Sequence, residues 1–277
     1  MKILIPTDFS EQAEYAFLLV QKLAKKMEAE IHFLHVMNVP DTVTLDESGN
    51  VQTCGEIDPR YVENRKAIVD RKLADLKVEY GPAIHTKVIF GKTTDSILSY
   101  STSHHFDLIV MGTKGAWGLK EMLSGSDTQQ IARKSTIPLL SLKCDRSDLE
   151  INHILLVHDF MDEQNEEFPL LKKFQEAFGT KVHLLQIIDD VSEEAKRGIL
   201  AKMEEYVRKN KVNNFEKHLI RDIDVENGVI HFNQMLDMDL ICIGTHGRSG
   251  FSHFFKSSAT EKVLNHLFKP IISFRLN

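Results

Sequence analysis

Three glycines and a serine with phosphate-binding spacing lie in the first half of the chain. They are Gly112, Gly115, Gly125 and Ser126, arranged as Gly-x2-Gly-x9-Gly-Ser. Glycine allows positive φ and lets a backbone N–H approach a ligand where a Cβ would collide. Ser126 falls where a helix would begin, and a helix N-terminus favours an anion. The spacing therefore indicates a phosphate-binding turn, although each residue taken alone is also explained as a turn residue or a helix cap.

The segments on either side of this turn have the composition of a strand and a helix. Residues 108–111, Leu-Ile-Val-Met, are too few for a helix and rich in branched side chains, which is typical of a core strand. Residues 128–134 are polar and compatible with a helix. Met111 would thus end a buried strand, and the glycines would follow at its carboxyl end.

The rest of the first half alternates strand and helix patterns. Strands are expected at 2–6, 30–36, 84–90, 108–111 and 137–142, helices at 11–27, 61–78, 95–103 and 128–134, and a long surface loop at 38–59. Strict alternation predicts an α/β fold with a doubly wound five-stranded parallel sheet. With strand order 3-2-1-4-5, a ligand would bind beyond the carboxyl ends of the first and fourth strands, where the order reverses.

Asp8 follows the first of these two strands. Its carboxylate could accept hydrogen bonds from a ribose hydroxyl or an adenine amine, and a helix-capping role is the alternative. The predicted topology brings Asp8 close to Gly112, which favours the ligand role.

The pattern of the first half is repeated in the second. Residues 153–160 align with 2–9, residues 181–187 with 30–36, residues 239–247 with 107–115, and residues 269–274 with 137–142. The chain is therefore a tandem duplication with one module at 1–144 and the other at 150–277. The second module has Ser257 at the position of Gly125, which predicts that it has lost the ligand site and that one chain binds one nucleotide.

These motifs and their repetition over nearly the whole chain resemble the universal stress protein family. The resemblance implies two five-stranded α/β modules, which would pack through their last strands as a pseudo-twofold intramolecular dimer, and ATP, with or without Mg²⁺, at the glycine motif. It assigns Asp8 to the base and ribose, and Val36 to the adenine. Met111 is grouped with this site, and the motif residues Gly112, Gly115, Gly125 and Ser126 are assigned to the phosphates and ribose.

Asp127 departs from the family pattern, which commonly has an apolar residue after the Gly-Ser pair. A carboxylate beside a triphosphate would repel it, unless the side chain faces away as a charge at a helix N-terminus. Lys114 and Lys120 could offset this charge.

Composition excludes several classes of function. A net charge of −6 argues against a nucleic-acid-binding protein. No stretch approaches the ~20 apolar residues that a membrane span needs, and three widely spaced cysteines favour a reducing, cytoplasmic location.

Three functions remain open from the sequence. The first is a nucleotide-binding stress or regulatory module with an unidentified protein partner, whose chains could assemble into a higher homo-oligomer. The second is a slow ATPase, for which Asp127 is the nearby carboxylate, and the third is a structural paralogue without a ligand. No Walker motif is present, adjacent His104 and His105 lack metal-site spacing, and no catalytic residue or metal ligand is assigned.

Overall fold

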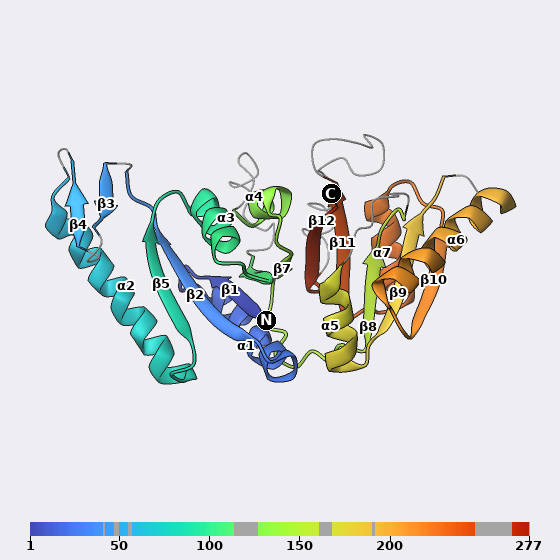
Figure 1. The fold of residues 1–277 in the computed structure, drawn as a ribbon, viewed down its shortest axis with the longest axis horizontal. Coiled ribbons are helices and arrows are strands. Elements are labelled where there is room, and N and C mark those ends of the chain that lie inside the picture. Colours follow the sequence, from blue (N-terminus) through green and yellow to red (C-terminus); the bar gives the residue numbers. More distant parts are fainter. Residues whose placement is uncertain are drawn as a thin grey trace.

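A continuous ten-stranded sheet runs through the molecule in the computed structural model (Figure 1). The structure describes residues 1–40, 42–46, 50–54, 57–113, 127–160, 168–189, 192–246 and 268–276. Across the sheet the strands follow the order β10-β9-β8-β11-β12-β7-β6-β1-β2-β5. Each half of this series has the order 3-2-1-4-5 when its strands are counted from the start of the module, so the predicted fold is confirmed.

In the described part of the first module, five strands belong to the sheet and four helices accompany them. Its elements are β1 (Lys2–Pro6), α1 (Glu11–Met27), β2 (Glu30–Met37), β3 (Val43–Leu45), β4 (Val51–Thr53), α2 (Pro59–Tyr80), β5 (His85–Phe90), α3 (Thr93–Ser103), β6 (Leu108–Gly112), α4 (Asp127–Lys134) and β7 (Leu139–Leu142).

The second module repeats the alternation of strands and helices. Its elements in the described ranges are β8 (His153–Val157), α5 (Pro169–Phe178), β9 (Lys181–Ile187), α6 (Glu193–Asn210), β10 (Phe215–Ile220), α7 (Val225–Met235), β11 (Leu240–His246) and β12 (Ile271–Leu276).

Helix α1 shows how local sequence determines an element beside the predicted site. Ser10 caps it, because the Ser10 hydroxyl accepts a hydrogen bond from the Ala13 backbone N–H at 3.3 Å. Acidic residues occupy the first turn and basic residues the last, as the helix dipole favours. The apolar positions recur at helical spacing, and six of them are buried: Ala13, Ala16, Phe17, Leu19, Val20 and Leu23. This burial fixes α1 against the sheet.

The two faces of the sheet carry separate hydrophobic cores. One core contains side chains of α1, α2, α5 and α6, and the other contains side chains of α3, α4 and α7. Alternation along β1 divides its residues between them, with Ile3 and Ile5 in the first core and Leu4 in the second. Every parallel strand is therefore covered on both faces, as doubly wound sheets require.

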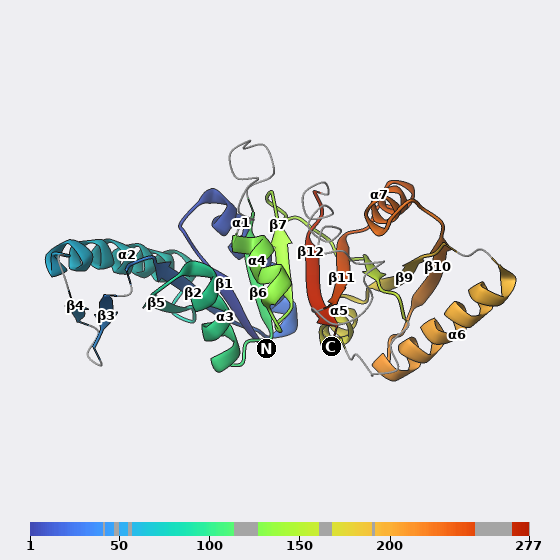
Figure 2. The same cartoon turned by 90° about the horizontal axis from the view of Figure 1, so that it is seen from above.

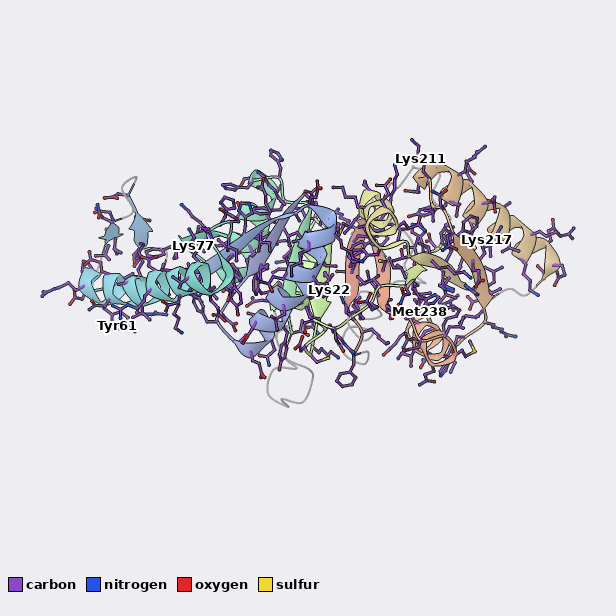
Figure 3. All side chains as sticks on the ribbon, turned by 90° about the horizontal axis from the view of Figure 1, so that it is seen from below. Lys22, Tyr61, Lys77, Lys211, Lys217 and Met238 are labelled. Atoms are coloured by element: carbon purple, nitrogen blue, oxygen red, sulfur yellow. The ribbon has the colours of Figure 1, made fainter. Side chains whose placement is uncertain are left out.

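The modules join through their closing strands, β7 and β12, which pair antiparallel at the centre of the sheet (Figure 2). Leu140 lies opposite Ile272, and both side chains are buried. Helices α1 and α5 also lie at the junction, where Lys22 forms an ion pair with Glu150 at 2.9 Å (Figure 3). The predicted pairing of the last strands is confirmed.

The segment expected to be one long loop, residues 38–59, contains more structure than the sequence indicated. Within it, β3 and β4 form an antiparallel hairpin, and Val43 and Val51 pack with Met37 and Val62 in a small third core. The strands have three residues each, too few to show the alternation by which strands are recognised. Among the described helices, none has the length and apolar character that crossing a membrane needs.

Candidate functional site

A pocket of about 510 Å³ lies at the carboxyl ends of β1, β2 and β6. Its volume falls in the range of roughly 300 to 1,000 Å³ that is typical of small-molecule sites. The first turns of α1, α3 and α4 complete its described wall. This is the place where the strand order reverses, and four predicted residues line it together: Asp8, Val36, Met111 and Gly112.

Asp8 lies in a strained turn between β1 and α1. Phe9 next to it has a φ of 62°, a conformation that costs energy for a bulky residue. The turn is held by two hydrogen bonds, from the Ser10 N–H to Asp8 Oδ1 at 2.9 Å and from the Phe9 N–H to Thr7 Oγ1 at 3.0 Å. Ser10 is the cap of α1, so Asp8 is not that cap. The exposed Asp8 carboxylate lines the pocket.

His35 supports this turn from β2. Its Nδ1 atom lies 2.7 Å from the Thr7 carbonyl oxygen, to which it donates, and its ring stacks on Phe9 with the centroids 4.9 Å apart. Burial is the main cause that lowers the pKa of His35 below its usual value, so the ring is neutral at pH 7. The pocket therefore gains a rigid wall without a positive charge.

Gly112 ends β6 at a close approach to α1. A Cβ added to Gly112 would lie 1.8 Å from the Gln12 carbonyl oxygen and 2.2 Å from the Gln12 carbonyl carbon. Backbone atoms of a helix that is packed against the sheet cannot move away cheaply. The described structure thus gives Gly112 a packing role, in addition to its place in the pocket wall.

Asp127, the departure from the family pattern, is the first residue of α4. Its Oδ1 atom accepts a hydrogen bond of 2.8 Å from the Thr94 hydroxyl of α3. The residue is exposed and lines the pocket. Its carboxylate therefore places negative charge at the pocket wall, with one oxygen hydrogen-bonded to α3.

The described residues that line the pocket carry a net negative charge. At neutral pH the charged side chains among these residues are Asp8 and Asp127. Gly115, Gly125 and Ser126, together with Lys114 and Lys120, lie outside the described residues. The prediction that the three motif residues meet a phosphate therefore stays a prediction.

Several lining residues were not singled out from the sequence. They come from the ends of other elements, namely Thr7, Ser10, Gln12, His35, Thr93, Ile97, Thr128 and Gln130. Thr7 and Ser10 flank Asp8, and His35 precedes Val36, so closeness to predicted residues was a signal for these three. The residues from α3 and the first turn of α4 enter through tertiary packing.

Comparison with known proteins identifies the family. The model of the universal stress protein family matches residues 1–143 and again residues 150–275. The chain belongs to the universal stress protein family.

Relatives agree with this membership. Universal stress protein MJ0531 of Methanocaldococcus jannaschii is 31% identical over 142 residues, which cover 51% of this chain and 81% of that protein. The structure of a universal stress protein from Archaeoglobus fulgidus covers 99% of this chain and 98% of its own, with a TM-score of 0.75 and 21% identity, a likeness of fold. A universal stress protein in complex with cAMP covers 51% of this chain and 96% of its own, at 18% identity and a TM-score of 0.37.

The second module is packed differently at the place that corresponds to the pocket of the first module. Ile187, which aligns with Val36, is buried, and a Cβ added to Gly228 of α7 would lie 2.4 Å from the Ile187 Cδ1 atom. Ile243, which aligns with Met111, is 1% exposed. Helix α7 therefore packs closely against the part of the second module that corresponds to the pocket wall of the first module.

The turn after β8 nevertheless keeps the geometry of the first module. Phe160 has a φ of 51°, matching Phe9, and its N–H donates to His158 Nδ1 at 2.7 Å. His158 is buried and takes the place of Thr7. Asp159 is retained, but its side chain is 13% exposed and lies 3.5 Å from the His158 Nδ1 atom. Gly247 and Ser257 lie outside the described residues.

Proposed function

We propose that the first module binds ATP and that the protein acts as a nucleotide-responsive regulatory module. The observation that carries this proposal is the convergence of Asp8, Val36, Met111 and Gly112 on one pocket at the reversal of strand order. Ligands of open α/β sheets bind at this place.

The described walls fit the base and ribose half of ATP. Val36, which is partly exposed, and Met111, which is 9% exposed, give an apolar surface against which a purine ring can pack. The exposed carboxylate of Asp8 can accept hydrogen bonds from ribose hydroxyls, as acidic residues do in dinucleotide sites.

The phosphate half requires positive charge that the described lining lacks. Asp8 and Asp127 would raise the energy of a bare triphosphate in the pocket. A bound Mg²⁺ ion, or Lys114 and Lys120 of the glycine-motif segment, would offset this charge. The N–H groups at the first turn of α4 add a partial positive charge on the same side.

A slow ATPase is the second candidate, and the observation that favours it is the carboxylate of Asp127 in the pocket wall. Hydrolysis needs a group that positions water and a metal ion at the γ-phosphate. Because Asp127 already accepts a hydrogen bond from Thr94, we assign it to helix pairing. Phosphate release should thus be the same in the parent and in Asp127→Ala, and turnover that the substitution abolishes would establish the ATPase. The cytoplasmic location remains a prediction.

Replacing Asp8 by alanine should weaken ATP binding roughly tenfold to a hundredfold, because hydrogen bonds to a charged group contribute about 1.5 to 3 kcal/mol. Titration calorimetry with Mg-ATP measures the change. The matched control is Asp159→Ala, the same substitution in the second module, for which we expect the parent affinity. Equal affinities of Asp8→Ala and the parent would remove Asp8 from the site.

The same titration should give one nucleotide per chain. The crowding of Ile187 by α7 and the serine at position 257 both oppose a second site. Two equivalent ATP sites per chain would contradict this inference.

A further inference from the structure

Three histidines and a glutamate form a row across β8, β9 and β10 in the second module. His153, His183 and Glu216 lie near the amino ends of their strands, and His218 follows Glu216 by two residues on the same face of β10. The row thus lies toward the amino ends of these strands, whereas the pocket of the first module lies at the carboxyl ends of its own strands. Lys217, between Glu216 and His218, points to the other face and bonds to Glu204 of α6 at 2.6 Å (Figure 3).

Three ligand atoms of this row form a triangle of the size that a metal ion needs. His183 Nδ1 lies 3.1 Å from His218 Nε2 and 3.6 Å from Glu216 Oε2, and the remaining side, His218 Nε2 to Glu216 Oε2, is 3.7 Å. Tetrahedral Zn²⁺ with bonds of about 2.0 to 2.1 Å holds its ligand atoms about 3.4 Å apart. All three sides are within a few tenths of an ångström of that value.

The fourth residue, His153, is in the position of a group that orients a metal ligand. Its Nδ1 atom lies 3.1 Å from His183 Nε2, the ring nitrogen opposite the triangle. Metal-bound histidines almost always donate their second N–H to an acceptor, which fixes the tautomer and the ring plane. His153 can accept this hydrogen bond and so leave His183 Nδ1 free for a cation.

The surroundings of the triangle favour neutral imidazoles and leave one side of it open to solvent. His183 is 3% exposed and lies with His218 against the Phe232 ring of α7. Burial disfavours the charged imidazolium form of His183. The Glu216 side chain is half exposed, and its other oxygen, Oε1, bonds to Lys181. Solvent can reach the triangle past Glu216, and water can supply the fourth ligand.

We propose that His183, Glu216 and His218 bind a divalent transition-metal ion of the Zn²⁺ class, with His153 as a positioning residue. Two imidazoles and a carboxylate are a ligand set that Zn²⁺ accepts with water in the fourth position. In the metal-free state a proton lies between His183 Nδ1 and His218 Nε2. The metal displaces this proton, and the ring that loses it takes up a proton at its other nitrogen, so both imidazoles stay neutral.

The first module offers a matched comparison, because Glu30, His32 and His85 also lie together on neighbouring strands. There the rings of His32 and His85 stack face to face, with centroids 4.4 Å apart and planes 15° from parallel. The rings of His183 and His218 are also nearly parallel, at 19°, but their centroids are 5.3 Å apart and His183 Nδ1 meets His218 Nε2 at 3.1 Å, so these two nitrogens can share one ion. We therefore assign the metal to the second module alone.

The test uses the full-length chain, freed of metal with a chelator. Calorimetry should give one Zn²⁺ per chain, and Co²⁺ should produce the intense visible absorption of a four-coordinate ion. His218→Gln and Glu216→Gln, both at partly exposed positions, should abolish the Co²⁺ absorption and keep the parent circular dichroism spectrum. His85→Gln should leave the Co²⁺ absorption and the circular dichroism spectrum unchanged. His153→Gln should weaken Zn²⁺ binding by about 10- to 100-fold.

Three results would overturn the proposal. The first is a parent chain that binds no Zn²⁺ at micromolar concentration. The second is a folded His218→Gln variant that keeps the parent affinity, and the third is a loss of binding in His85→Gln equal to that in His218→Gln. As a readout that does not depend on spectroscopy, Zn²⁺ should raise the Tm of the parent and not that of His218→Gln, because an ion that binds the folded chain stabilises it.

Discussion

Gly112→Ala is expected to lower the free energy of unfolding of the first module by about 2 to 3 kcal/mol, the upper part of the usual range for overpacking. The new Cβ would lie 1.8 Å from the carbonyl oxygen of Gln12 in α1. Helix α1 is held by buried side chains such as Phe17 and Leu23, so its backbone can retreat only if that packing is disturbed. Urea unfolding followed by circular dichroism measures the change.

Gly198→Ala is the matched control. Gly198 is exposed on α6, and a Cβ there would meet no atom within 4 Å. Alanine is a better helix former than glycine, so this variant should gain about 0.5 to 1 kcal/mol. The same substitution should thus have opposite signs at the two positions. A Gly112→Ala variant as stable as the parent would mean that β6 and α1 lie further apart than the structure places them.

The sequence predicted the fold well because its signals are local and repeated. The apolar runs of β1 and β6 and the helical spacing of α1 can each be recognised within about 15 residues. The alignment of residues 153–160 with residues 2–9 shows that the same pattern occurs twice, which supports the assignment of each element. Strand order followed from the alternation of elements, and with it the convergence of Asp8 and Gly112.

The features that escaped prediction depend on tertiary contacts. The reason for glycine at position 112 is the carbonyl oxygen of Gln12, about a hundred residues earlier in the chain. The triangle of His183, Glu216 and His218 depends on the register of β9 and β10, in which His183 lies opposite Glu216. A search for closely spaced ligands cannot find such a set, because each strand contributes residues from a different part of the sequence.

Residues 1–144 expressed alone are expected to form a homodimer through β7. In the whole chain Leu139, Leu140 and Ser141 pair with Ser273, Ile272 and Ile271 of β12, and the β7 side chains there are buried. Without the second module this strand would be an open apolar edge, which proteins avoid by pairing or covering it. Light scattering should give twice the mass of the fragment.

The geometry of the homodimer follows from the register in the whole chain. The antiparallel pairing is centred on Leu140 and Ile272, so two copies of β7 related by a twofold axis would place Leu140 opposite Leu140. Helix α1 would then pack against its own copy in place of α5.

Competition between the two modules provides the control for this prediction. When residues 1–144 are mixed with residues 150–277, the fragments should form a 1:1 complex, because β12 and α5 supply the native surfaces, including the ion pair of Lys22 with Glu150. A fragment 1–144 that stays a folded monomer at high concentration would show that β7 does not need a partner. The duplication would then join two self-sufficient modules, whereas the buried pairing of Leu140 with Ile272 indicates that it joined two halves of an existing dimer.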